Sequence, residues 1–214
     1  MTELVTPDRF DPPNIGERVQ SASPGARRVH QAILRHFAAT GAAPDPSDYE
    51  TAALTELHER DLIRLDDSGA IVVAYPFSGT ETPHRVHITD GASAWSMCAI
   101  DALGIAAMLD QDIAIESTDP HNRQPIRVDI HNRQATWTPS TTVVFVGVAD
   151  CCHADEPSVD RCCGVLNFFT TTSSAAAWHT NHPDTSGQPV DQATALRVGT
   201  EIFGSLLTRI AEPG

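Results

Sequence analysis

The chain has 214 residues, and 28 acidic residues against 14 basic ones give it a net charge of −14. All the basic residues are arginine, which excludes lysine Schiff-base chemistry and a phosphate-binding loop that ends in lysine. So acidic a surface repels phosphate backbones, and we expect no nucleic-acid partner. No apolar run approaches the ~20 residues that span a bilayer. Residues 1–12 lack the basic and apolar regions of a secretory signal, so we expect a cytoplasmic protein without membrane attachment.

The N-terminal part predicts a small helical unit. Residues 1–24 are rich in Pro, Asp, Gly and Ser and suggest a loose arm. Residues 25–80 predict a winged-helix-like domain, with helices at 26–39 and 48–60 and a hairpin of strands at 62–65 and 70–75. Its helices carry more acidic than basic residues, so we expect a scaffold and not a DNA-binding module.

Residues 81–214 predict a second domain, in which a mixed sheet packs against helices. A helix is expected from about Ser93 to Leu109, with Ser93 as its N-cap. Strands are expected at 113–116, 126–130, 141–148 and 163–171, and helices at 175–179 and 191–210. The apolar run at 143–146 predicts a central strand. The whole chain is therefore expected to be α+β.

Five cysteines are present, as Cys98 and the adjacent pairs Cys151-Cys152 and Cys162-Cys163. An odd number in clusters is unlike a disulfide framework, so thiols reserved for chemistry or metal binding are expected. Cys98 and Asp101 share a face of the expected helix, and the positive end of the helix dipole would favour a Cys98 thiolate. Burial would raise the pKa of Asp101 and allow it to hold a proton near neutral pH. Taken alone, the pair also fits a core cysteine and a solvated aspartate.

The Cys162-Cys163 pair lies at the expected start of a strand, where neighbours point to opposite faces. One cysteine would face a pocket and the other the core. Zinc sites prefer a two-residue gap between paired cysteines, so an ordinary zinc ribbon is not expected.

Four features together resemble the organomercurial (alkylmercury) lyases of bacterial mercury resistance. They are Cys-Ala-Ile-Asp at 98–101, the Cys-Cys pair followed by Phe-Phe at 168–169, the Ala-Ala-Trp-His segment that ends at His179, and Gly-Thr-Glu-Ile-Phe at 199–203. The resemblance implies that Cys98 and Cys162 bind mercury and that Asp101 donates a proton. Cys163 matches a family cysteine that is not essential. Trp95 lies three residues before Cys98, where the family pattern places it directly before.

The resemblance implies a lyase that cleaves the carbon–mercury bond by protonolysis. Thiolates bind soft mercury far better than oxygen ligands do, and a neighbouring carboxylic acid can protonate the bound carbon. No cofactor is expected, since mercury enters with the substrate. An external thiol, or a mercuric reductase, is expected to remove Hg(II).

Two alternative functions stay open at this point, and so does the role of one cysteine pair. The chain could be a thiol-rich heavy-metal sensor or buffer, which would leave Asp101 without a role, or a family member repurposed for another organometallic substrate. Cys151, Cys152 and His153 could form an accessory site that passes Hg(II) outward, or an exposed pair without function.

Overall fold

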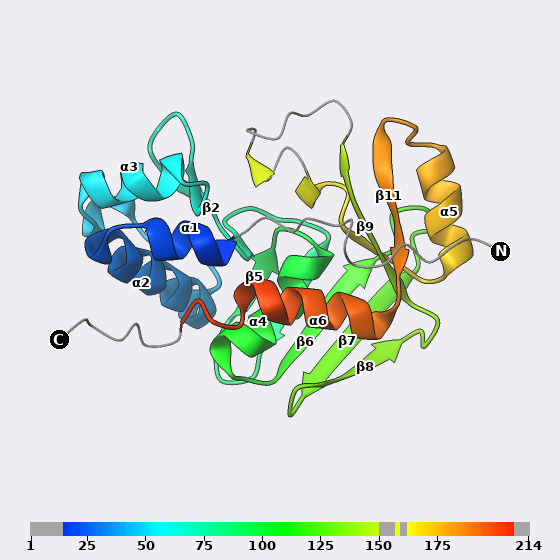
Figure 1. The fold of residues 1–214 in the computed structure, drawn as a ribbon. Helices are drawn as coiled ribbons and strands as arrows, with labels where there is room; N and C mark the ends of the chain where they lie inside the picture. The colour runs from blue at the N-terminus through cyan, green and yellow to red at the C-terminus, as the bar shows by residue number, and fades with distance from the viewer. Residues whose placement is uncertain (1–14, 150–156, 159–161, 208–214) are drawn as a thin grey trace.

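The computed structural model describes residues 15–149, 157–158 and 162–207, and it has mixed α+β architecture, as predicted. Three helices open the described chain: α1 (Ile15–Ser21), α2 (Pro24–Thr40) and α3 (Thr51–Glu59) (Figure 1). The predictions of α2 and α3 are confirmed. The Ser23 hydroxyl accepts the backbone N–H of Ala26 at the start of α2, and Gly41, at φ 75°, ends the helix.

Part of the expected N-terminal arm is helical. Residues 15–21 form α1, because Ile15 and Val19 lie one turn apart and are both buried against the core. The remainder of the arm, residues 1–14, lies outside the described residues.

The larger sheet has eight strands in the order β1-β2-β3-β5-β4-β6-β7-β8. All its described strand pairs are antiparallel, so the expectation of a mixed sheet is wrong. Their bounds are β1 Ile63–Leu65, β2 Ile71–Ala74, β3 Phe77–Ser78, β4 His84–Ile88, β5 Ser93–Ser96, β6 Ile113–Thr118, β7 Pro125–His131 and β8 Gln134–Thr138. The β1–β2 hairpin continues through β3 into the rest of this sheet, and the winged-helix arrangement is not confirmed. The domain boundary between residues 80 and 81 stays a prediction.

A second sheet of three strands has the order β10-β9-β11. Its central strand β9 (Val143–Ala149) confirms the prediction from the apolar run. The flanking strands are β10 (Asn167–Phe169) and β11 (Thr185–Val190). Helix α5 (Thr172–Thr180) packs against this sheet and buries Trp178 against the rings of Phe145 and Phe169.

Two helices form the layer that carries the site. Helix α4 (Ala99–Leu109) lies against β4, β5 and β6, and α6 (Gln192–Phe203) crosses α4 on its outer side (Figure 1). The crossing is close because both helices have glycine there: a Cβ on Gly199 would lie 2.7 Å from the carbonyl oxygen of Ile100. No helix among the described residues is both long enough and apolar enough to cross a membrane.

Two local predictions around the cysteines are wrong. Residues 93–96 form strand β5 and not helix, because Ala94 and Ser96 are buried while Trp95 points outward beneath the guanidinium of Arg85. The helix therefore begins at Ala99, and Cys98 is its N-cap.

Cys162 and Cys163 lie in a helical turn and not in a strand. The carbonyl oxygen of Cys162 accepts the backbone N–H groups of Val165 and Leu166, and pairing with β9 begins only at Asn167. The turn, and not strand alternation, therefore sets the directions of the two thiols.

Candidate active site

Three of the chain's chemically reactive side chains meet in the core. The Sγ atoms of Cys98 and Cys163 and a carboxylate oxygen of Asp101 all lie within 4.8 Å of one another, and all three residues are buried. Cys98 and Asp101 come from the first turn of α4, and Cys163 comes from the turn before β10. The backbone N–H of Ala99 donates to the carbonyl oxygen of Leu166 at 3.0 Å, which fixes this turn against the start of the helix.

Cys98 is a thiol in the free protein. Its Sγ accepts the backbone N–H of Asp101 at 3.4 Å, as an N-cap side chain does. Burial nevertheless raises the pKa of Cys98 to about 12, and this outweighs the hydrogen bonds that lower it. The helix dipole, which the sequence led us to expect would favour a Cys98 thiolate, is therefore outweighed by burial. The dipole effect is worth about 1 kcal/mol, less than the cost of a buried, uncompensated charge.

Asp101 is a buried acid that keeps its proton near neutral pH. Its side chain is 6% exposed, and its Oδ2 atom has no hydrogen-bond partner among the described residues. Burial raises the pKa of Asp101 to about 7, against a partial lowering by Cys98. The pKa shift expected from the sequence has this direction and cause. A carboxyl with this pKa can give up a proton at physiological pH and be reprotonated.

Cys162 has a different partner. Its thiol donates to the carbonyl oxygen of Ser158 at 3.3 Å. The structure thus places Cys163 in the cluster with Cys98 and Asp101, and leaves Cys162 at its edge. The assignment of Cys98 and Cys162 as the mercury ligands stays a prediction, since both neighbouring cysteines line the same cavity.

The cavity itself is small and enclosed, at about 20 Å³, which is room for about one water molecule. It is lined by Ile15, Tyr75, Cys98, Ile100, Asp101, Ser158, Cys162, Cys163, Leu166, Ile202 and Phe203. Most of these are apolar, and none is an arginine or a histidine. An organic group could occupy this space only if the walls move apart, while the thiols and the carboxyl already face one another.

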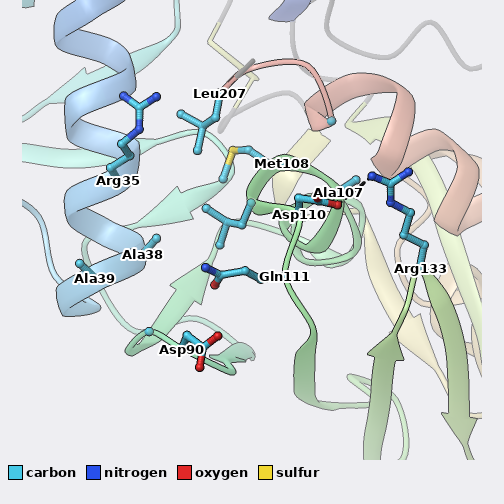
Figure 2. Close-up of a pocket in the computed structure, with 13 residues that line it drawn as sticks. Arg35, Ala38, Ala39, Asp90, Ala107, Met108, Asp110, Gln111, Arg133 and Leu207 are labelled. Carbon is cyan, nitrogen blue, oxygen red and sulfur yellow. Dashed lines mark hydrogen bonds and ion pairs between the residues drawn. The ribbon is translucent and has the colours of Figure 1, made fainter. Parts of the chain in front are cut away.

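Three larger hollows lined by described residues lack this chemistry. Figure 2 shows one of about 560 Å³ at the C-terminal end of α4, where Arg35, Asp90 and the ion pair of Asp110 with Arg133 are exposed. It contains no cysteine. It lies some eleven residues along α4 from Cys98, or about 16 Å at 1.5 Å per residue. Size alone therefore does not identify the site.

One predicted group of residues lies outside the described chain, and two residues that were not predicted line the cavity. Cys151, Cys152 and His153 lie outside the described residues, and the accessory site stays a prediction. Conversely, Tyr75 and Ser158 line the cavity although no motif marked them. A tyrosine at a strand end and a lone serine in a polar segment carry no sequence signal, because only the fold brings them to Cys98.

The geometry defines a class of protein: one with a closed, largely apolar site in which a soft-metal ligand set adjoins a proton donor. The comparisons with known proteins agree. A family model described as alkylmercury lyase matches residues 77–204, a range that includes Cys98, Asp101, Cys162 and Cys163. The chain belongs to the alkylmercury lyase family.

Individual relatives carry the same description. The chain is 31% identical to an alkylmercury lyase of Staphylococcus epidermidis over 136 residues, which are 63% of this chain and 60% of that protein. It is 27% identical to an alkylmercury lyase of Streptomyces lividans over 177 residues, which are 82% of this chain and 76% of that protein. The match thus spans less than two thirds of the Staphylococcus protein.

A solved structure shares the fold. The crystal structure of the mercury-bound form of MerB2 superposes with a TM-score of 0.72 at 21% identity, over 91% of this chain and 97% of that one. The arrangement of the two sheets and their helices is thus one already seen in a solved protein.

Proposed function

We propose that the chain cleaves the carbon–mercury bond of organomercurials by protonolysis, yielding a hydrocarbon and Hg(II). One observation carries the proposal: Asp101, a buried acid with an unpartnered oxygen and a pKa of about 7, faces two thiols. A simple metal-binding site would need the thiols but would have no use for the protonated carboxyl. Family membership supports the same chemistry.

The proposed reaction begins as a thiol exchange at the metal. Mercury bound to carbon and to an external thiolate exchanges that thiolate for Cys98, and the Cys98 proton leaves with the external thiol. A second cysteine then binds mercury, and its proton replaces the one that Asp101 gives to the carbon in the same step. Asp101 protonates the carbon, the carbon–mercury bond breaks, and Hg(II) remains on two sulfurs. Each proton in this sequence starts on a thiol or on Asp101, and no redox change occurs.

The second ligand in this proposal is Cys162, as the family resemblance implies. Binding requires its thiol to leave the Ser158 carbonyl oxygen, whereas Cys163 already lies beside Cys98. Cys162→Ser and Cys163→Ser, tested separately, decide the matter. If only Cys163→Ser abolishes turnover, the ligand is Cys163 and the assignment of Cys162 fails.

The proposal extends to the protein's setting. The substrate is a small organomercurial, mercury arrives with it, and turnover needs no resident cofactor. An external thiol, or a mercuric reductase, accepts Hg(II) in the cytoplasm. The helices before residue 60 serve as a winged-helix-like scaffold without a nucleic-acid partner.

The test is direct. The protein is incubated with methylmercury or phenylmercury and excess small thiol, and methane or benzene is assayed. Asp101→Ala is expected to retain mercury binding and lose hydrocarbon release. If the folded wild type releases no hydrocarbon, the proposal fails. If Asp101→Ala turns over at the wild-type rate, Asp101 is not the proton donor.

A further inference from the structure

A carboxylate outside the cavity connects the N-terminal helices to the cysteine turn. Asp61 follows α3, and its Oδ2 accepts from Arg18 Nη1 at 2.7 Å, from the backbone N–H of Ser158 at 2.9 Å and from the Ser158 hydroxyl at 2.7 Å. Its Oδ1 accepts from the Tyr75 hydroxyl at 3.3 Å. Asp61 does not line the cavity, yet it binds two residues, Tyr75 and Ser158, that do.

The same contacts reach Cys162. Ser158 is 2% exposed, and its carbonyl oxygen accepts the Cys162 thiol. Because Asp61 accepts from both the backbone N–H and the hydroxyl of Ser158, it holds the residue whose carbonyl oxygen accepts this thiol. The contact bridges 97 residues of sequence, from the end of α3 to the segment before the cysteine pair.

We propose that Asp61 is a positioning residue for Cys162: through Ser158 it holds the Cys162 thiol at the cavity wall and sets the cost of releasing it. The inference rests on the proposed function, in which Cys162 must leave the Ser158 carbonyl oxygen to bind mercury. It connects the N-terminal helices to the site, because Arg18 lies in α1 and Asp61 directly follows the end of α3.

Asp61→Asn tests the contacts without disturbing the backbone. Asp61 has a φ of 52°, in the left-handed region, which asparagine tolerates nearly as well as aspartate. Asparagine keeps one carbonyl acceptor but loses the charge that binds Arg18 and both donors of Ser158. Asp66→Asn is the matched control, because Asp66 also accepts from a serine amide and hydroxyl, those of Ser68, within an exposed turn.

The measurement is the rate of alkylation of each thiol in the metal-free protein, followed by tandem mass spectrometry. Cys151 and Cys152 are replaced by serine so that only Cys98, Cys162 and Cys163 react. All three are buried, so the rates report local opening. Asp61→Asn is expected to raise the Cys162 rate at least about tenfold relative to Cys98, which is about 1.4 kcal/mol. Asp66→Asn is expected to change neither rate.

An equal rise at Cys98 and Cys162 would show general loosening and overturn the proposal, and so would unchanged rates. Ser158→Ala provides a second test that keeps the Asp61–Arg18 pair: it removes one donor and leaves the amide, so a smaller selective rise at Cys162 is expected. An unselective or absent rise there also counts against the proposal. Labelling uses no organomercurial, so its outcome is independent of the hydrocarbon assay that tests the proposed function.

Discussion

Replacing Asp101 by asparagine should make the protein more stable at alkaline pH while removing its proton donor. Asparagine approximates the shape of the protonated carboxyl but cannot ionise. The unfavourable free energy of ionising a buried carboxyl, which lowers the stability of the wild type, is therefore absent in the variant. Active-site groups held in unfavourable surroundings for chemistry commonly have this signature.

The magnitude follows from the pKa of Asp101, which burial raises from its ordinary value of 3.8 to about 7. The folded state binds the proton more tightly, so this contribution to stability is fully present below pH 3.8 and is lost as pH rises through about 7. About three pKa units at 1.36 kcal/mol each make the loss about 4 kcal/mol.

Urea unfolding of wild type and Asp101→Asn between pH 4 and pH 8 measures the difference. The two free energies of unfolding are expected to differ little at pH 4 and to diverge by several kcal/mol by pH 8, with the variant the more stable. Hydrocarbon release by the wild type is expected to fall above pH 7 as Asp101 loses its proton. Parallel pH profiles of stability for the two proteins would refute the raised pKa and with it the proton-donor argument.

Three further substitutions test buried contacts of the described fold. His30 is fully buried with neither ring nitrogen partnered among the described residues, and burial lowers its pKa from 6.5 to about 4. The contribution of neutral His30 to stability is present above pH 6.5 and is lost as pH falls through about 4. Leucine has no group to protonate, so in unfolding titrations His30→Leu is expected to remove about 3 kcal/mol of the free energy of unfolding that the wild type loses in acid. Gly199→Ala is expected to lower the free energy of unfolding by about 1–3 kcal/mol, because the new Cβ would lie 2.7 Å from the Ile100 carbonyl oxygen. Gly16→Ala is the control: its Cβ would meet nothing within 4 Å, and no loss is expected in the same unfolding measurement. Asp119 accepts five hydrogen bonds, from the turn after β6 and from Thr170 and Ser174 near the start of α5. Asp119→Asn is expected to lower the free energy of unfolding in urea by about 3 kcal/mol. A loss near zero would show that the donors find other acceptors.

The sequence predicted those elements whose apolar residues follow a clear local pattern. Helix α2 shows its helical period and strand β9 its continuous apolar run, and both are found as expected. Strand β5 was missed because its four residues, Ser93–Ser96, end just before a strongly helical segment and have weak strand propensity. Pairing with β3 and β4 decides its conformation, and that tertiary contact outweighs local preference.

The candidate site likewise has one part that local sequence predicts and another that depends on tertiary contacts. Cys98 and Asp101 lie three residues apart, so any helical start at this point brings them together, and the sequence sufficed. The direction of Cys162 depends on a helical turn and on a hydrogen bond to Ser158, whose amide is in turn held by Asp61. No periodicity encodes a contact between residues about 100 positions apart. Fold and family followed from motifs, but the choice between adjacent cysteines needed the structure.

Charge balance explains why this site pairs thiols with an acid and not with a base. Among the described residues, none that lines the cavity is cationic, so no described side chain compensates a bare thiolate there. Burial accordingly raises the pKa of Cys98 and favours its protonated form. Hydrogen bonds with Cys162 and Cys98, and then burial, raise the pKa of Cys163. In the proposed reaction each thiolate forms only as mercury binds it, and the released proton reaches carbon through Asp101. The cavity is then neutral before and after the reaction, since two thiols and a carboxylic acid become Hg(II) on two sulfurs and a carboxylic acid. A permanent cation would stabilise the thiolates in the resting protein, but it would also lower the pKa of Asp101 and remove the proton that the carbon must receive.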